Sequence, residues 1–332
     1  MKLINKDEKI FIAGSTGMVG SSIKRKLNYF GYKKLICPKK SELDLSDINL
    51  VKRWFELNKP KVVILAAAKV GGIYANNQYP VDFLLENLKI QNNIIETAWK
   101  NKTRRLLFLG SSCIYPKDAE QPIKEEKLLT GPLEKTNEYY ALAKISGIKL
   151  CQALRNQYGF DAISLMPTNL YGAGDNYHNQ NSHVLPALLN RFHLHSIENK
   201  RTIECWGSGK PRREFMHVDD LADACIFALE KWSPDNKEAP LDETGKPLTL
   251  LNVGTGKDIT IKRLTEIISD LTTFKGEIIW NTTKPDGTFQ KLLDVSKLKS
   301  LGWESKISLL EGLKMTYKDY KNELLNNNLR TI

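Results

Sequence analysis

The chain has 332 residues, of which 41% are hydrophobic, and it carries a net charge of +11. It has no apolar run of about eighteen residues, which argues against a membrane span. Its lysines are spread out rather than clustered with aromatic side chains, which argues against nucleic-acid binding. Two explanations of the positive charge remain: an electrostatic field that gathers anionic small molecules, or simply a lysine-rich composition. The five cysteines are scattered and form no Cys-x-x-Cys pair, so we expect no metal site and no disulfide framework, and a reducing cytoplasm is the simplest setting.

Short apolar runs alternate with amphipathic stretches through the front half of the chain. Strands are expected over residues 9–13, 34–37, 61–67, 105–109 and 162–166, and helices over 18–29, 49–57, 82–101 and 137–158. This alternation predicts an α/β fold with a Rossmann-type doubly wound parallel sheet. In such a sheet, ligands bind beyond the carboxyl ends of the strands. The polar segment 233–246 is expected to be a surface loop.

The first turn between a strand and a helix is rich in glycine. It consists of Gly14, Ser15, Thr16, Gly17, Met18, Val19 and Gly20. The Gly-x-x-Gly-x-x-Gly spacing lets the backbone approach a pyrophosphate at the amino end of a helix, although tight turns also use glycine for geometry alone. Because the pattern lies directly between a strand and a helix, we expect it to bind a dinucleotide.

The end of the second strand indicates which dinucleotide to expect. An acidic residue there would bind the ribose hydroxyls of NAD, but the sequence at this point reads Pro38-Lys39-Lys40. Lys40 is suited to pair with a 2′-phosphate, which favours NADP(H); the alternative is a solvated lysine on a loop. Further on, Asp44 and Leu45 are expected to line the adenine pocket, unless Asp44 caps the next helix.

Two later patterns bring reactive groups into one region. The strand at 105–109 is followed by Gly110-Ser111-Ser112-Cys113, and Tyr140 and Lys144 lie four residues apart, on one face of a helix. A protonated lysine beside a phenol is expected to lower the pKa of the tyrosine from about 10 toward neutrality. Tyr140 can then donate a proton to a carbonyl oxygen while hydride reaches the carbon, and Ser111 can hydrogen-bond the same oxygen. A lone Tyr-x-x-x-Lys pair is common on helices, and it is the position of this pair in a dinucleotide-binding fold that favours a catalytic role.

Further sequence blocks accompany these patterns along nearly the whole chain. They are Phe11-Ile12-Ala13-Gly14 and residues 67–73, 110–116, 129–134, 166–172, 181–184, 211–215, 251–256, 284–287 and 291–294. On these blocks the chain resembles the extended short-chain dehydrogenase/reductases and, more narrowly, the GDP-L-fucose synthase family of GDP-4-keto-6-deoxy-D-mannose 3,5-epimerase/4-reductases. The resemblance implies an NADPH-dependent C4 reductase of a GDP-4-keto-6-deoxy sugar, a hexose or a heptose, with C3 and C5 epimerisation in the same site.

The resemblance also implies roles for individual residues. Ser111, Tyr140 and Lys144 match the reductase triad, and Cys113 and His183 match the base and acid of epimerisation. Expected cofactor contacts are the seven residues from Gly14 to Gly20, then Lys40, Asp44, Leu45, Ala67, Ala68, Leu109, Gly110, Tyr140, Lys144, Pro167, Asn169, Leu170 and His183. Expected contacts with the GDP-sugar are Ser112, Asn169, Val184, Arg191, Trp206, Arg213 and Asp286.

The chemistry of these residues leaves alternatives open. Cys113, beside the triad, is expected to titrate close enough to neutrality to act as one partner in epimerisation, but a free cysteine is more often a small buried apolar residue. His183 suits the other partner, or it is a structural or cofactor-contacting imidazole. Arg212 and Arg213 are suited to grip a diphosphate in a forked geometry, or they form a solvated surface pair.

Other functions remain as alternatives. One is a reductase that acts only after a separate epimerase in GDP-6-deoxy-heptose synthesis. A nucleotide-sugar dehydratase would need an acid pair where this chain has Cys113 and Ile114. The most remote alternative is a non-catalytic dinucleotide-binding protein, which would be expected to lack Tyr140 or Lys144. Thr16 stands where the family often has an arginine near the 2′-phosphate, and Lys40 is expected to compensate.

The resemblance finally implies an organisation. Residues 1–170 and about 215–256 are expected to form the NADP-binding Rossmann domain, and about 171–214 and 257–332 a smaller α/β domain that binds the nucleotide sugar. A homodimer is expected through the long helices near Asp82 and Tyr140. These expectations place the chain in cytoplasmic nucleotide-sugar metabolism that serves capsule or surface polysaccharides, with no nucleic-acid or membrane partner.

Overall fold

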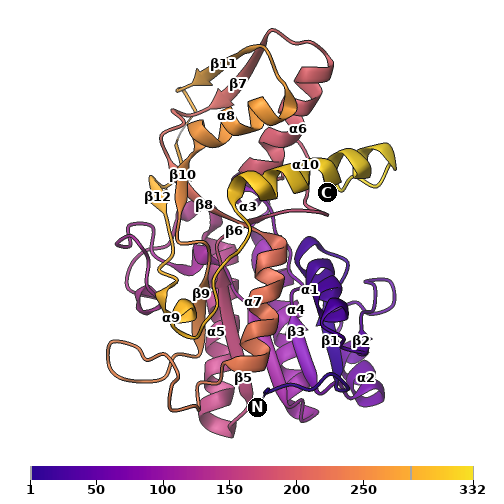
Figure 1. Cartoon of the computed structure of the whole chain (residues 1–332). Coiled ribbons are helices and arrows are strands. Elements are labelled where there is room, and N and C mark those ends of the chain that lie inside the picture. Colours follow the sequence, from indigo (N-terminus) through magenta and orange to yellow (C-terminus); the bar gives the residue numbers. More distant parts are fainter. Residues whose placement is uncertain (1, 285, 332) are drawn as a thin grey trace.

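Six parallel strands form a sheet at the centre of the structure, a computed structural model that describes residues 2–284 and 286–331 (Figure 1). Pro285, within the 284–287 block, lies outside the described residues. The sheet has the order β2-β1-β3-β4-β5-β9 and consists of β1 (Lys9–Ala13), β2 (Lys34–Ile36), β3 (Val62–Leu65), β4 (Arg105–Leu109), β5 (Asp161–Pro167) and β9 (Leu250–Val253). The chain runs from β1 to β2 on one side and returns to β3 on the other. This reversal puts a topological switch point at the carboxyl ends of β1 and β3, where such sheets bind ligands.

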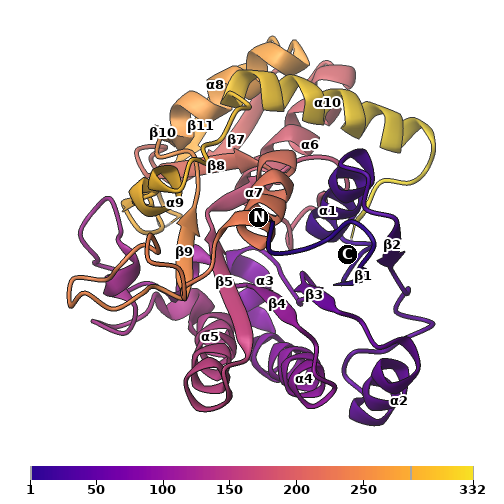
Figure 2. The ribbon, with the colours of Figure 1, turned by 60° about the horizontal axis from the view of Figure 1, so that its bottom comes forward.

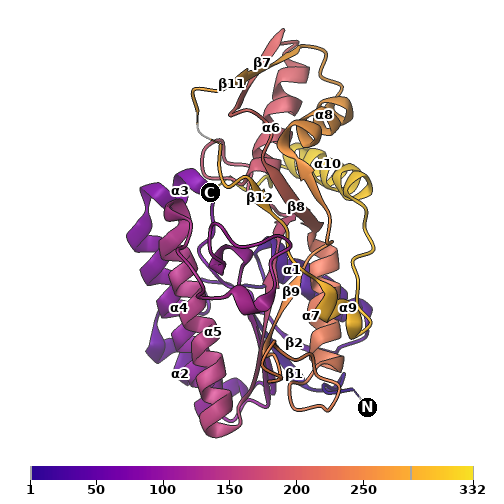
Figure 3. The ribbon, with the colours of Figure 1, turned by 90° about the vertical axis from the view of Figure 1, so that its left-hand side faces the viewer.

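Helices cover both faces of the central sheet (Figure 3). One face packs against α1 (Met18–Tyr29), α7 (Val218–Lys231) and the short α9 (Ser296–Ser300). The other packs against α2 (Ile48–Asn58), α4 (Pro80–Lys100) and α5 (Glu138–Tyr158). Because both faces are covered, β3 and β4 are buried along their whole length, as is usual for parallel strands.

The strands and helices predicted for the front half of the chain are confirmed, with boundaries that differ by three residues or fewer. One helix was not expected: α3 (Ile73–Gln78) precedes α4, and Pro80 stands in the first turn of α4. Asp47 caps α2 by accepting hydrogen bonds from two backbone N–H groups, so Asp44 is not the cap of this helix. Residues 233–246 carry no helix and only an isolated bridge at Leu241, which confirms the predicted loop.

A smaller lobe continues from the carboxyl end of β5 (Figures 1 and 2). Its strands are β6 (Asn169–Tyr171), β7 (Thr202–Trp206), β8 (Arg212–His217), β10 (Asp258–Thr260), β11 (Glu277–Asn281) and β12 (Gln290–Lys291). Its helices are α6 (Val184–Ile197), α8 (Ile261–Thr272) and α10 (Leu309–Leu325). β8 pairs with β6, β10 and β12, while β7 pairs with β11. The lobe has a hydrophobic core of its own, and β8 leads directly into α7, which returns the chain to the central sheet.

Three short 3-10 turns lie between β4 and α5. They are η1 (Ser112–Ile114), η2 (Glu125–Lys127) and η3 (Lys135–Asn137). Within residues 2–284 and 286–331, no helix is long and apolar enough to cross a membrane. In the same ranges, no group of three or more histidine, cysteine or acidic side chains is placed to hold a metal ion.

Candidate active site

The glycine-rich turn forms a cradle between the end of β1 and the start of α1. Gly14 has a φ of +88°, and a Cβ there would lie 2.6 Å from the backbone nitrogen of Ala67, just after β3. A Cβ at Gly20 would lie 2.1 Å from the carbonyl oxygen of Gly14. In the described chain, no side chain caps the amino end of α1 and no acidic residue lies in its first turn. The free N–H groups there suit a pyrophosphate, so the cradle fits the predicted dinucleotide.

The expected adenosine contacts lie at the ends of β2 and β3, on either side of β1. Ala67, Ala68, Asp44 and Leu45 are half-buried, and Lys40 is exposed. Asp44 accepts hydrogen bonds from the backbone N–H and the hydroxyl of Ser46, at 2.9 Å and 2.7 Å, and these bonds lower its pKa. Asp44 is therefore an anion held in its own loop, while Lys40 projects a cation into solvent.

Ser111, Tyr140 and Lys144 meet where β4 ends and α5 begins. Nζ of Lys144 donates a hydrogen bond to the carbonyl oxygen of Leu109 at 2.8 Å and lies 5.8 Å from the centroid of the Tyr140 ring. The Tyr140 hydroxyl lies near the side chain of Ser111, which favours the phenolate. The fold thus gathers a phenol, an ammonium and an alcohol at the carboxyl end of a central strand.

Burial controls the protonation of these groups. Burial, and then the charge of Cys113, raise the pKa of Tyr140, while the polar side chain of Ser111 lowers it. Burial lowers the pKa of Lys144 to about 8. The prediction that Lys144 lowers the pKa of Tyr140 is therefore wrong, because the ammonium is directed at the Leu109 carbonyl and removal from water penalises the phenolate. Tyr140 stays protonated at neutral pH, which is the form that a proton donor requires.

Cys113 lies beside the triad, with 8% of its surface exposed and its Sγ 3.1 Å from Oγ of Ser111. Burial raises the pKa of the thiol, against the lowering effects of Lys291, Ser111 and Lys144. The prediction that Cys113 titrates close to neutrality is wrong in this environment. Lys291 of β12 brings a second ammonium to the thiol. The sequence marks it only as part of a motif block, because nothing local shows that β12 reaches η1.

His183 stands at the amino end of α6, and it is exposed. A Cβ at Gly71 would lie 3.0 Å from the ring of Phe83 and 3.4 Å from the carbonyl oxygen of Asn181, in the loop before His183. Phe83 packs edge-on against Tyr140, with ring centroids 6.2 Å apart. Gly71 therefore lies between the loop before His183 and Phe83, which in turn packs on Tyr140. Although part of the side chain is exposed, the surrounding protein desolvates the imidazole and lowers the pKa of His183, so the neutral form predominates at pH 7.

The remaining predicted contacts around the nicotinamide position lie at or just after the end of β4, at the end of β5, in β6 and at the start of α6. Leu109, Gly110, Ser112 and Pro167 are buried, Leu170 is half-buried, and Val184 is exposed beside His183. Nδ2 of Asn169 donates a hydrogen bond to the carbonyl oxygen of Glu214 at 2.8 Å. A Cβ at Gly110 would lie 2.4 Å from the sulfur of Met166, so a larger residue there would displace the Met166 side chain.

Trp206 and Asp286 flank a tight turn in the lobe. Trp206 is 63% exposed, with Nζ of Lys284 5.4 Å from its ring centroid, so it is not a core residue. Asp286 accepts hydrogen bonds from the backbone N–H and the hydroxyl of Ser208 at 2.9 Å and 2.6 Å. Gly207 has a φ of +77°, and a Cβ there would lie 2.3 Å from the Asp286 carboxylate. Asp286 therefore holds the turn that presents the open face of Trp206.

The three arginines near this turn differ in their partners. Arg212 forms an ion pair with Asp258 at 2.6 Å, so the predicted forked grip by Arg212 and Arg213 is wrong for Arg212. Arg213 is half-buried, and burial lowers its pKa against the opposing charge of Asp286. Arg191 donates a hydrogen bond to a backbone carbonyl of β7. Arg213 is therefore the arginine of this pair that stays free of a carboxylate ion pair within the described residues.

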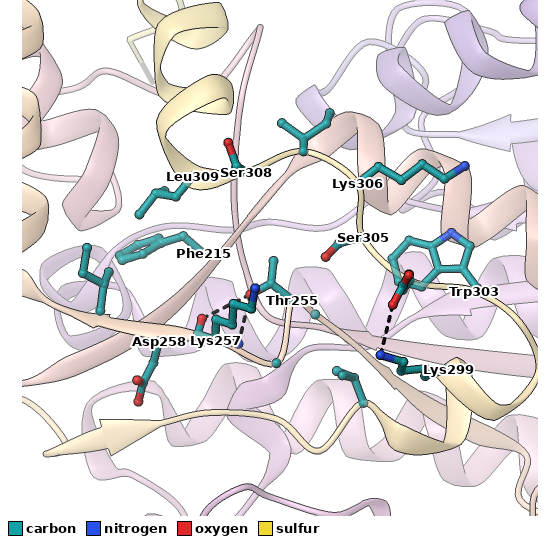
Figure 4. Close-up of a pocket in the computed structure, with 16 residues that line it drawn as sticks. Phe215, Thr255, Lys257, Asp258, Lys299, Trp303, Ser305, Lys306, Ser308 and Leu309 are labelled. Atoms are coloured by element: carbon teal, nitrogen blue, oxygen red, sulfur yellow. Dashed lines mark hydrogen bonds and ion pairs between the residues drawn. The ribbon is translucent and has the colours of Figure 1, made fainter.

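A cavity of about 700 Å³ lies apart from these groups, between β10 and the segment that precedes α10 (Figure 4). Its walls include Thr255, Lys299, Trp303 and Ser308. Lys299 is paired with Glu304 at 3.1 Å. None of the predicted catalytic, cofactor or sugar contacts lines this cavity, so it is not the site of the triad.

Comparisons with known proteins give this arrangement a context. Residues 10–239 match the NAD dependent epimerase/dehydratase family. The chain is 55% identical over 318 residues to the putative GDP-L-fucose synthase 2 of Arabidopsis thaliana, covering 96% of this chain and 93% of the relative. It is 51% identical over 311 residues to the GDP-L-fucose synthase of Escherichia coli K12, covering 94% and 96%. It is also similar to the solved GDP-D-glycero-L-gluco-heptose synthase of Campylobacter jejuni in the presence of NADPH, with a TM-score of 0.87, 36% identity, and coverage of 96% and 99%.

Proposed function

Because the chain belongs to the NAD dependent epimerase/dehydratase family and, within it, to the GDP-L-fucose synthase family, we propose that it reduces the C4 ketone of a GDP-4-keto-6-deoxy sugar with NADPH. One observation carries this proposal. Ser111, Tyr140 and Lys144 converge at the carboxyl end of β4, on the same sheet edge as the glycine cradle. A dinucleotide held in the cradle and a ketone at the triad would meet at this edge.

Reduction follows from the protonation of the triad. NADPH supplies the hydride when it is bound. Tyr140, protonated because it is buried, donates first a hydrogen bond and then its proton to the C4 oxygen as negative charge develops there. The hydroxyl of Ser111 donates a second hydrogen bond to the same oxygen. Lys144, held against the Leu109 carbonyl, places positive charge near the phenolate that remains.

Epimerisation before reduction is part of the same proposal. A ketone at C4 acidifies the hydrogens on C3 and C5, and inversion needs a base on one face of the sugar and an acid on the other. Cys113 is the base: burial keeps it a thiol at rest, and the positive charges of Lys291 and Lys144 stabilise the small fraction of thiolate that takes the proton. His183, which follows the loop next to Gly71, is the acid, and it acts through its protonated form, a minority at pH 7 and a strong proton donor because the pKa is lowered.

Heavy water separates the two activities. The protein is incubated in heavy water with NADPH and either GDP-4-keto-6-deoxy-mannose or a GDP-4-keto-6-deoxy-heptose, the second sugar being chosen for the likeness to the heptose synthase. We expect NADPH oxidation together with deuterium at C3 and C5 of the product. Oxidation without deuterium would support a reductase that acts after a separate epimerase. No oxidation with either sugar would contradict the proposal.

We also propose a division of labour between the two parts of the fold. The six-stranded sheet and its helices bind NADP(H), and the lobe that carries Trp206, Arg213 and Asp286 binds the GDP-sugar. In residue ranges, this division corresponds to 1–170 with about 215–256, and to about 171–214 with 257–332, except that α9 packs against the central sheet. Support comes from the separate hydrophobic core of the lobe and from the place of the cradle in the sheet.

A homodimer through α4 and α5 is the expected assembly. The two helices pack side by side, and their outer faces expose Val81, Leu85, Tyr139 and Leu142 by 40% to 68%. Apolar patches of this kind mark interaction surfaces. Light scattering after size exclusion should give the mass of two chains for the wild type and of one chain for Leu142→Glu; a monomeric wild type would contradict this assembly.

The cytoplasm is the proposed compartment, because all five cysteines are free.

A further inference from the structure

The chain returns to the glycine cradle after α10. Oε1 of Glu323, in α10, accepts a hydrogen bond from the backbone N–H of Gly174 at 2.8 Å. The carbonyl oxygen of Arg330 accepts one from the backbone N–H of Tyr177, also at 2.8 Å. A Cβ at Gly174 would lie 3.8 Å from Cα of Met18, the first residue of α1. The loop 172–177 therefore lies against the amino end of α1 and holds the tail there.

The side chain of Arg330 reaches the cradle itself. Its Nη1 lies 3.9 Å from the position that a Cβ at Gly17 would occupy. Gly17 is the residue before α1, at the end of the helix that no described side chain caps. Residues 14–20 include no basic side chain, so any side-chain cation at the cradle must come from elsewhere in the chain.

The guanidinium of Arg330 has no direct bonding partner among the described residues. Among the residues that the structure describes, it forms no hydrogen bond or ion pair, and its interaction with Asp175 is a longer-range attraction. Asp175 is 4% exposed, and its Oδ2 has no hydrogen-bond partner in the described chain. The buried carboxylate of Asp175 thus attracts Arg330 but does not hold its guanidinium through a hydrogen bond. The five N–H donors of an arginine are suited to bidentate contact with phosphate oxygens.

We propose that Arg330 is a ligand of the dinucleotide pyrophosphate, carried to the glycine cradle by the C-terminal tail. The proposal rests on the cofactor site described above and adds a contact from the last residues of the chain. The pyrophosphate is preferred over the 2′-phosphate because Arg330 approaches Gly17, where the backbone of the turn meets the start of α1, and not Lys40 at the end of β2.

Calorimetric titration of the whole protein with NADP⁺ and with NAD⁺ tests this assignment. Arg330→Met should raise the Kd for both dinucleotides by about 10- to 100-fold, the usual range for a hydrogen bond to a charged group. Arg330→Lys should recover part of the affinity, because it keeps the charge. Arg263→Met is the matched control: Arg263 is an exposed arginine of α8 that pairs with Glu266 at 2.9 Å, and its loss should leave both Kd values unchanged.

The outcomes are distinguishable. Unchanged affinity in Arg330→Met would overturn the assignment. A loss confined to NADP⁺ would also overturn it and move the contact to the 2′-phosphate. A loss that Arg330→Lys does not relieve at all would also overturn the assignment, because the side chain would then act by packing rather than by charge. A wild type that binds neither dinucleotide would instead contradict the proposed function.

Discussion

Replacing Gly20 by alanine should damage cofactor binding more than folding. The new Cβ would lie 2.1 Å from the carbonyl oxygen of Gly14, whereas ordinary contact begins at 3.4 Å, so the turn must move by more than 1 Å. The obstructing atom belongs to the backbone and cannot rotate away as a side chain would. Overpacking of this kind typically costs roughly 1–3 kcal/mol.

Two effects oppose each other in the free energy of unfolding. Gly20 lies in the first turn of α1, and alanine is better than glycine in a helix by roughly 1 kcal/mol. The net destabilisation should therefore not exceed about 2 kcal/mol. The part of the chain that moves is the surface that would hold the pyrophosphate. If the turn must return to its wild-type position to bind NADPH, the complex bears the overpacking cost, and the Kd for NADPH rises about 5- to 150-fold.

Titration calorimetry with NADPH and thermal unfolding without cofactor measure the two quantities separately. Gly159→Ala is the control, because Gly159 has a φ of +66° and a Cβ there would meet nothing within 4 Å. That variant should lose roughly 1–2 kcal/mol of stability from backbone strain and keep its NADPH affinity. Wild-type affinity in Gly20→Ala, or an equal loss of affinity in both variants, would refute the reasoning about the cradle.

Three further substitutions test the site. Cys113→Ser should slow deuterium exchange at C3 and C5 by at least about 100-fold, because a serine hydroxyl is a far weaker base, and exchange at the wild-type rate would exclude Cys113 as the base. Burial holds the pKa of Lys144 at about 8, below its ordinary value of 10.5, so the unfolded chain binds more protons than the folded chain between these two pH values. In urea unfolding, the free energy of unfolding of the wild type should therefore rise by up to about 3 kcal/mol from pH 8 to pH 10.5 relative to Lys144→Met. Parallel pH dependences of the two proteins would contradict this. Trp206→Ala should weaken GDP-sugar binding by about 1–3 kcal/mol through lost stacking while NADPH affinity stays constant, and an unchanged KM for the sugar would remove Trp206 from the site.

The central sheet could be predicted because its strands are short apolar runs bounded by turn residues. β1 and β4 begin and end at the predicted residues, and so does α1. No helix or strand was predicted beyond residue 166, and three of the elements that were not predicted are too short to show a period. β10 has three residues, β12 has two and α3 has six, so their places depend on partners elsewhere in the fold.

The chemical groups of the site could be predicted from local patterns, but their protonation and partners could not. The pKa values of Tyr140 and Cys113 are raised because segments far apart in the chain bury them. The pairing of Arg212 with Asp258 likewise depends on the register of β8 against β10. Local spacing identifies which side chains can react, while the packing of distant segments decides in which charge state they do so.

Single-turnover reduction by Tyr140→Phe tests the central claim most directly. NADPH oxidation is followed with saturating GDP-4-keto-6-deoxy sugar, and Tyr139→Phe, which alters the exposed neighbouring phenol, is the control. If Tyr140 gives its proton to the C4 oxygen, Tyr140→Phe should reduce the ketone about 10²- to 10⁴-fold more slowly while its NADPH affinity and the rate of the control stay at wild-type values. Reduction by Tyr140→Phe at the wild-type rate would contradict the account.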